Sequence, residues 1–177
     1  MLKQYGYGKY KNVVSSIEFE RILSASGPYS GHVLRSSDGN VPQKIAFLQC
    51  VGSRDPKFGK EYCSSVCCMY TAKEAVIAKE HTEGLEATIF SMDIRAYGKD
   101  FDKYIERAKD EYGVKYVRSR ISSIEEIPGT KDLKLTYETE EGKIISETFD
   151  MVILGVGLTP PKDASTVSYT HLTLPTN

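Results

Sequence analysis

The sequence predicts an α/β protein with a doubly wound parallel sheet and an antiparallel β-meander, and three observations lead to this fold class. A continuous apolar segment at 44–52 is closed by glycine, as expected for a buried parallel strand. A helical pattern separates it from a second apolar segment at 85–92, which makes a βαβ unit with adjacent parallel strands. Shorter alternating segments with glycine-containing turns then occupy 121–149, as expected for a meander.

The remaining elements follow in chain order. Ser15 or Ser16 is expected to cap a short helix that runs to about Ala25, and the glycines and prolines of 26–42 predict an extended loop. The helix of the βαβ unit is expected to run from near Glu61 to His81, with a broad apolar side. The other expected elements are a helix at 100–112, a strand at 114–117, meander strands at 121–127, 133–139 and 143–149, and a returning buried strand at 150–154.

Bulk composition excludes several functional classes. The 177 residues carry a net charge of −1, which argues against binding to nucleic acid or to an anionic membrane surface. No apolar segment approaches the ~20 residues needed to span a bilayer, and the first residues lack the apolar region of a signal peptide. Clustered cysteines without a secretion signal indicate a reducing compartment, so a cytoplasmic location is expected.

The four cysteines are the strongest functional signal. They are Cys50, Cys63, Cys67 and Cys68, spaced C-x12-C-x3-C-C within nineteen residues. Cys50 ends the first strand, where open α/β sheets bind their ligands, and Cys63 and Cys67 would be i and i+4 on the expected helix. Cys68 would be rotated about 100° from Cys67, which favours a bulky iron–sulfur cluster over a single zinc ion. Zinc, a redox dithiol and four unrelated buried thiols remain alternatives.

The loop between the first strand and its helix departs from the usual nucleotide-binding pattern. The predicted architecture is that of the NAD(P)-binding domain of two-dinucleotide flavoproteins, in which this loop reads G-x-G-x-x-G and approaches a pyrophosphate. The chain contains no such motif, and its segment from Cys50 to Cys63 is long and charged. We therefore expect the cysteines to replace a nicotinamide site. Arg54, Lys57 and Lys60 in this loop would offset the charge of bound thiolates, or form an ordinary solvated loop.

Two cysteine motifs carry a family resemblance. The segments QCVGSRD at 49–55 and YCSSVCCMY at 62–70 resemble the A subunit of heterodisulfide reductase, whose flavin core is similar to thioredoxin reductase. The similarity extends from the tyrosine-rich start at 5–10, through 16–28 and 92–98, to GVGLTP at 155–160. It implies an oxidoreductase subunit that relays electrons between a [4Fe-4S] cluster and FAD. The implied metal ligands are Cys50, Cys63, Cys67 and Cys68.

The resemblance also implies partners and a domain layout. Expected partners are other subunits of a heterodisulfide reductase-like complex and hydrogenase- or ferredoxin-type electron carriers. Gly155, Gly157 and Thr159 would lie on the FAD side, and the chain is expected to be an internal fragment. The layout is a linker and short helix from the FAD-domain side at 1–41, a nucleotide-binding-like domain with the cysteines at 42–150, a return strand towards the FAD domain at 151–164, and a non-native tail at 165–177.

Two other functions remain open at this point. The first is an NAD(P)H-dependent flavoprotein disulfide oxidoreductase that uses a cysteine pair, and it needs a nucleotide-binding loop that the sequence lacks. The second is a non-catalytic docking module of a redox complex. Asp93 and Arg95 follow the second expected strand, where nicotinamide domains recognise ribose. We expect them to form a local surface pair, although Arg95 is also placed to contact a nucleotide or a partner protein.

Overall fold

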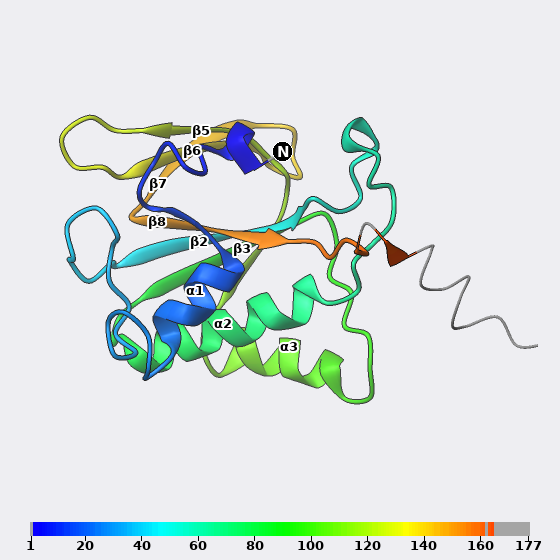
Figure 1. The fold of residues 1–177 in the computed structure, drawn as a ribbon, viewed down its shortest axis with the longest axis horizontal. Helices are drawn as coiled ribbons and strands as arrows, with labels where there is room; N and C mark the ends of the chain where they lie inside the picture. Colours follow the sequence, from blue (N-terminus) through cyan, green and yellow to red (C-terminus); the bar gives the residue numbers. More distant parts are fainter. Residues whose placement is uncertain (1, 162, 165–177) are drawn as a thin grey trace, which may run out of the picture.

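A computed structural model of the chain describes residues 2–161 and 163–164. Over this range the chain forms one parallel sheet, one antiparallel sheet and three α-helices (Figure 1). The helices are α1 (Ser16–Leu23), α2 (Cys67–His81) and α3 (Phe101–Asp110), and the 3-10 helices are η1 (Leu2–Tyr5) and η2 (Pro56–Phe58). The parallel sheet has the order β1 (Val13–Ser15), β8 (Met151–Val156), β2 (Lys44–Val51), β3 (Glu86–Ser91), β4 (Lys115–Arg118). The antiparallel sheet has the order β5 (Ile121–Glu126), β6 (Leu133–Glu138), β7 (Ile144–Phe149).

The predicted βαβ unit is confirmed. Strands β2 and β3 are parallel neighbours, with Ile45 opposite Ala87 and Phe47 opposite Ile89. Every residue from Ile45 to Leu48 is buried, which explains the continuous apolar segment in the sequence. Strand β8 returns to the other side of β2, so β2 lies in the middle of the sheet.

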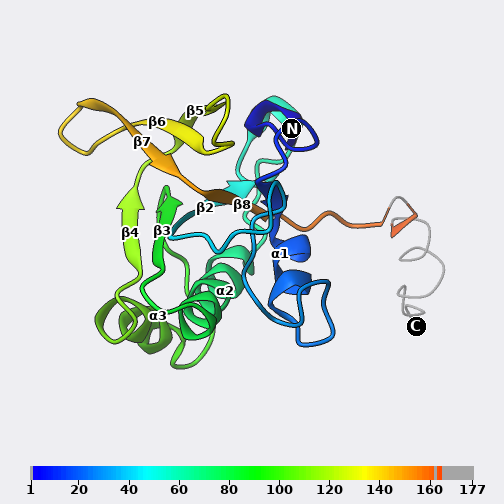
Figure 2. The ribbon, with the colours of Figure 1, turned by 90° about the vertical axis from the view of Figure 1, so that its left-hand side faces the viewer.

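The parallel sheet is covered differently on its two faces. Helices α1, α2 and α3 pack on one face, and the antiparallel sheet covers the other, as Figure 1 and Figure 2 show from two directions. Consecutive residues of β2 point to opposite faces of the sheet. Phe47 packs in the core beneath the helices, and Leu48 packs in the core beneath the meander. The predicted fold class, a parallel α/β sheet with an antiparallel meander, is confirmed.

Helix α1 begins as predicted. The Ser15 hydroxyl accepts a hydrogen bond from the Glu18 N–H at 3.3 Å, and the Glu18 carboxylate accepts one from the Ser15 N–H at 2.7 Å. This capping box satisfies two backbone donors that a helix start otherwise leaves free. The helix ends at Leu23, two residues before the predicted end.

The predicted start of the long helix is wrong. Helix α2 begins at Cys67 and not near Glu61, so Cys63 lies in the preceding loop and is not i−4 to Cys67 on a helix. Ser65 has a φ of 64°, a left-handed conformation that an α-helix cannot contain. The segment before it is held by hydrogen bonds to the residues that follow β2, a contact between separate segments that helix periodicity does not reveal.

The N-terminal residues belong to the same packed body as the sheet. Strand β1 pairs with β8, and Phe19 of α1 packs edge-on against Phe47 of β2, with ring centroids 5.6 Å apart. Buried Arg35 binds Asp132 at 2.7 Å and the Thr130 carbonyl at 2.5 Å, which ties the 26–42 segment to the meander. The division at 41, 150 and 164 stays a prediction, and the predicted tail at 165–177 lies outside the described residues. Within the described residues, no helix is both long and apolar enough to cross a bilayer.

Candidate cysteine site

The site lies at the carboxyl edge of the parallel sheet. After β2 the chain continues to β3, which is the neighbour of β2 on one side, whereas β8 is its neighbour on the other side. The strand order therefore reverses between β2 and β8. Open α/β sheets bind ligands at such a point because the loops diverge there. Cys50 is the next-to-last residue of β2, and α2 begins at Cys67 on the same edge (Figure 1).

Cys50 adopts an unusual backbone conformation. Its φ is 60°, in the left-handed region, and the register between β2 and β8 shifts between Leu48 and Val51. A residue other than glycine pays of order 1–3 kcal/mol for such a conformation, so the surrounding structure must hold it there. The Cys50 thiol lies near enough to the Cys67 thiol on α2 for each to affect the pKa of the other.

Cys67 and Cys68 occupy the first turn of α2. Both are buried, and the preceding residue Val66 provides no side-chain cap for the helix. The first turn of a helix presents free N–H groups and the positive end of the helix dipole, which stabilise thiolates. The two adjacent thiols also affect each other's pKa.

Cys63 approaches from the loop and is the most exposed of the four thiols. Its sulfur accepts a hydrogen bond from the Ser65 N–H at 3.4 Å, and the Cys68 sulfur accepts one from the Arg95 N–H at 3.4 Å. Two of the four sulfurs therefore receive backbone donors. Among the described residues, no three His, Cys, Asp or Glu side chains are arranged to hold a single metal ion.

The thiols influence one another's protonation. A hydrogen bond from Cys67 lowers the pKa of the Cys50 thiol, and the same bond raises the pKa of the Cys67 thiol to about 11. The hydrogen bond with Cys67 and burial raise the pKa of the Cys68 thiol. Arg54 contributes to the lowered pKa of Cys50 through its positive charge. Cys50 is thus the thiol of this trio that most readily carries a negative charge.

The charged groups around the site are largely paired. Asp93 lies between Arg54, with which it forms an ion pair, and Arg95, whose guanidinium is 3.3 Å away. The predicted local pair of Asp93 and Arg95 is confirmed. Lys57 lies over the ring of Phe58 and Lys60 over the ring of Tyr62, with nitrogen-to-centroid distances of 6.0 and 5.9 Å.

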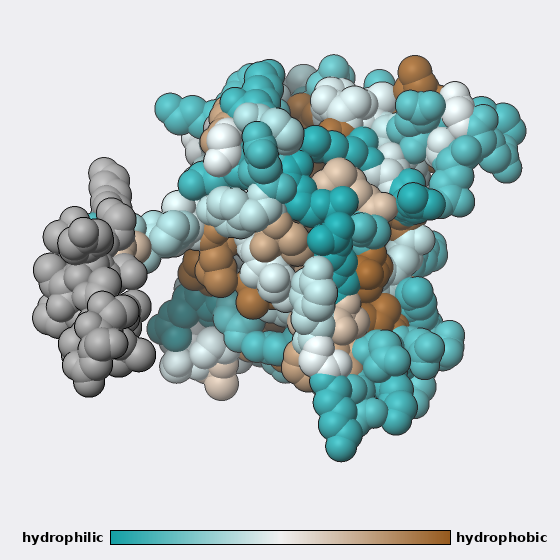
Figure 3. All heavy atoms as spheres, turned by 90° about the vertical axis from the view of Figure 1, so that its right-hand side faces the viewer, coloured by the Kyte–Doolittle hydropathy of each residue, from teal (hydrophilic) through white to brown (hydrophobic). Residues whose placement is uncertain are grey.

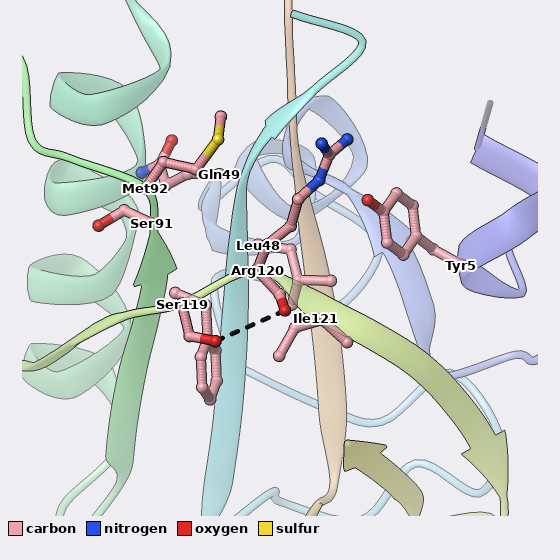
Figure 4. A pocket seen from close by; sticks show the side chains of 9 residues that line it. Tyr5, Leu48, Gln49, Ser91, Met92, Ser119, Arg120 and Ile121 are labelled. Atoms are coloured by element: carbon pink, nitrogen blue, oxygen red, sulfur yellow. Dashed lines mark hydrogen bonds between the residues drawn. The ribbon is translucent and has the colours of Figure 1, made fainter. Parts of the chain in front are cut away.

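A small cavity lies beside the ends of β2 and β3. It measures about 10 Å³, which is room for one water molecule. Figure 4 shows Tyr5 and Arg120 on one side of it and Gln49 and Met92 on the other, with the Ser119 hydroxyl pointing towards the Arg120 carbonyl. Ligand pockets usually measure roughly 300–1,000 Å³, so this cavity does not accommodate a nicotinamide nucleotide.

The outer surface of this edge carries apolar side chains. Tyr62 and Val66 of the cysteine loop are exposed, and so is Leu158 beyond β8, with 59% of its surface accessible. Figure 3 looks onto this edge and shows hydrophobic residues in patches across the middle of the face. The loop with Cys63 therefore lies next to exposed apolar groups.

The predicted FAD-side residues lie at the end of β8. A Cβ atom on Gly155 would lie 2.8 Å from the Leu48 carbonyl oxygen, and one on Gly157 would lie 2.6 Å from the Ser64 hydroxyl oxygen. Thr159 is exposed. Both glycines thus allow close packing against the chain's own backbone and loop, and their contact with FAD stays a prediction.

Sequence reasoning missed two residues of this site, Ser53 and Ser64. The Ser53 hydroxyl accepts hydrogen bonds from the N–H and the hydroxyl of Ser64, next to Cys63. The one signal for them in the sequence is that each lies within three residues of a motif cysteine.

Solved structures resemble the fold. A 2-naphthoyl-CoA reductase complex matches 92% of this chain and 19% of its own, with a TM-score of 0.54 and 16% identity. An L-lysine 6-monooxygenase from Pseudomonas syringae matches 85% of this chain and 41% of its own, with a TM-score of 0.53 and 10% identity. At such identities the likeness concerns the fold alone.

Sequence relatives are far more similar. No family model matches the chain. The A subunit of the H(2):CoB-CoM heterodisulfide,ferredoxin reductase of Methanothermobacter marburgensis is 46% identical over 170 residues, or 94% of this chain and 25% of that protein. The iron-sulfur A subunit of the CoB–CoM heterodisulfide reductase of Methanocaldococcus jannaschii is 45% identical over 162 residues, or 91% and 25%. The chain spans about a quarter of the length of these curated relatives. Over nearly its whole length, therefore, it is homologous to one segment of the A subunit of heterodisulfide reductase, as its cysteine motifs predicted.

Proposed function

We propose that this chain is the cluster-bearing segment of an electron-transfer subunit, in which the four cysteines hold a [4Fe-4S] cluster that exchanges electrons with FAD. The observation that carries the proposal is that four cysteines lie at one edge of the parallel sheet. They come from the end of β2 (Cys50), the loop (Cys63) and the first turn of α2 (Cys67 and Cys68).

The donor set fits such a cluster. All four candidate ligands are thiols, the usual ligands of a [4Fe-4S] cluster. Zinc knuckles usually use two cysteines two to four residues apart, whereas the first gap here is twelve residues and the last two cysteines are adjacent. The unusual φ of Cys50 is consistent with a ligand position that the fold must hold in place.

The protein also supplies groups that stabilise negatively charged sulfur. Backbone N–H groups of Ser65 and Arg95 donate to Cys63 and Cys68, and the positive end of α2 lies at Cys67. Hydrogen bonds to cluster sulfurs and limited solvent access both tune the potential of such centres. Cys50, Cys67 and Cys68 are buried, so the fold keeps water from three of the four ligands.

A bound cluster would supply one-electron transfer, and the chain would supply ligands, charge compensation and burial. The names of the relatives describe iron-sulfur and ferredoxin reductase subunits. We extend these names to this chain as proposals: its partners are other subunits of a heterodisulfide reductase-like complex and ferredoxin- or hydrogenase-type carriers, in the cytoplasm. FAD would be reached through Gly155, Gly157 and Thr159 at the end of β8.

The proposal is tested by anaerobic reconstitution of the purified chain with iron and sulfide. We expect about four irons and four sulfides per chain, together with broad visible absorbance and an EPR signal after reduction. Cys68→Ala should lose stable iron binding, while Ser122→Ala, a change in the meander strand β5, should keep it. Zinc without iron, or no metal in the folded wild-type protein, would overturn the proposal.

A further inference from the structure

The fully buried hydroxyl of Ser53 connects two cysteine-bearing segments. Ser53 follows Cys50 by three residues, and none of its surface is accessible. A hydroxyl in such a place needs partners, because an unpaired buried polar group costs about 1–3 kcal/mol.

Its partners flank Cys63 on both sides. The Ser53 Oγ donates to the carbonyl of Tyr62 at 3.0 Å and accepts from the N–H of Ser64 at 3.0 Å. It also accepts from the Ser64 hydroxyl at 3.1 Å, so its donor and both of its acceptor positions are used. The residue before Cys63 and the residue after it are therefore both hydrogen-bonded to the Ser53 hydroxyl.

The same network reaches the end of β8. The Ser64 hydroxyl accepts a hydrogen bond from the Leu158 N–H at 2.9 Å. The Gly157 N–H donates to the Val51 carbonyl at 2.8 Å, so the outgoing chain is also bonded to the end of β2. Three separate segments of the chain thus share one hydrogen-bonded junction.

The position of Cys63 depends on this junction more than the positions of the other three cysteines do. Cys50 belongs to strand β2, and Cys67 and Cys68 belong to helix α2, so each of these three residues is part of a regular element. Cys63 belongs to neither a strand nor a helix. The hydrogen bonds of Ser53, with the Arg54 N–H that also donates to the Tyr62 carbonyl at 2.9 Å, hold its segment against the sheet edge.

We infer that Ser53 is a positioning residue that holds Cys63 as the fourth ligand of the cluster. The inference rests on the proposed function, because it takes Cys63 to be a ligand. Residues that orient metal ligands typically contribute 10- to 100-fold to metal affinity. Ser53 acts through the backbone on either side of Cys63, at Tyr62 and Ser64.

The experiment compares the full 177-residue chain as wild type, Ser53→Ala, Ser64→Ala and the control Ser122→Ala. Ser122 is an exposed serine whose hydroxyl donates to the Thr136 carbonyl at 2.7 Å, a hydrogen bond that stays within the meander. After anaerobic reconstitution, Ser53→Ala should release iron to a chelator about 10- to 100-fold faster than wild type. Its EPR spectrum should convert to a three-iron type, as expected when one ligand of four is lost. Ser122→Ala should match wild type in both measurements.

The outcomes separate the two claims. Ser64→Ala keeps the Ser53 bonds to the Tyr62 carbonyl and the Ser64 N–H, so its iron release should be faster than wild type but slower than that of Ser53→Ala. If Ser53→Ala does not fold, Ser64→Ala decides, and wild-type iron release in it would overturn the inference. Four irons retained by Ser53→Ala as firmly as by wild type would overturn the inference alone. A folded wild-type chain that binds no iron would overturn the proposed function and the inference together.

Discussion

Gly157 runs so close to Ser64 that a Cβ atom on the glycine would lie 2.6 Å from the serine hydroxyl oxygen. The carbonyl oxygen of Gly52 would lie 2.9 Å from the same Cβ atom, and this backbone atom cannot rotate away. The end of β8 is therefore packed against the cysteine loop without room for one methyl group. Gly157 therefore allows the end of β8 to pack against the cysteine loop, which a residue with a side chain would prevent.

Gly157→Ala is expected to disturb the site and lower stability. Inserting a methyl group into a closely packed position costs about 1–3 kcal/mol, measured as the free energy of unfolding in urea. The variant should also release reconstituted iron faster, because the methyl group displaces Ser64 next to Cys63. Gly84→Ala is the matched control: its φ is 76° with nothing within 4 Å of the new Cβ, so it should cost about 1–2 kcal/mol in backbone strain and leave iron release unchanged. Equal iron release from both variants would contradict the packing argument.

Cys63 should be the first of the loop and helix thiols to react with iodoacetamide in the metal-free folded protein. Cys67 has 1% of its surface exposed and its pKa is raised to about 11, whereas Cys63 is partly exposed in the loop. Because alkylation requires an accessible thiolate, we expect labelling of Cys63 to be at least ~10-fold faster than that of Cys67. Peptide mass spectrometry measures the order. In denaturant the difference should disappear, and equally fast labelling of Cys67 in the folded protein would rule out this packing of the site.

Glu74 should make the protein less stable as the pH rises. Its side chain is on α2 with 2% of the residue exposed, and burial, with a smaller contribution from Glu20, raises its pKa from 4.5 to about 9. Between these values the folded state keeps a proton that the unfolded state releases, so stability falls from about pH 4.5 to pH 9 and then levels off. The loss at pH 7 is on the order of 3 kcal/mol.

Replacing the Glu74 carboxyl with an amide tests whether this group makes stability fall as the pH rises. Glu74→Gln should flatten the decline of the unfolding free energy between about pH 5 and pH 9, since the amide does not titrate. The variant should gain most over wild type at alkaline pH and least near the pKa of the unfolded carboxyl. Glu83→Gln, an exposed change just after α2, should leave the pH dependence as it is. An unchanged slope in Glu74→Gln would show that Glu74 is not protonated in the folded protein.

Much of the fold could be predicted because its signals are local. The apolar runs of β2 and β3 reflect strands in a buried layer. The i, i+3, i+4, i+7 pattern of α3 reflects a helix with one buried face. The start of α2 could not be predicted this way. Residues 61–66 carry no proline or glycine, and the left-handed conformation of Ser65 and the bonds of Ser53 interrupt the helix.

The position of the four cysteines at the ligand-binding edge of a βαβ unit follows from the order of residues alone, because their spacing and the surrounding periodicity are local. The way in which the thiols are held follows from the folded chain. The bulge at Cys50, the hydroxyl of Ser53 beside Cys63, the Arg95 N–H on Cys68 and the fit of Gly157 against Ser64 join separate segments of the chain. Contacts of this kind depend on where folded strands bring the backbone together, and no local pattern of residue types specifies them.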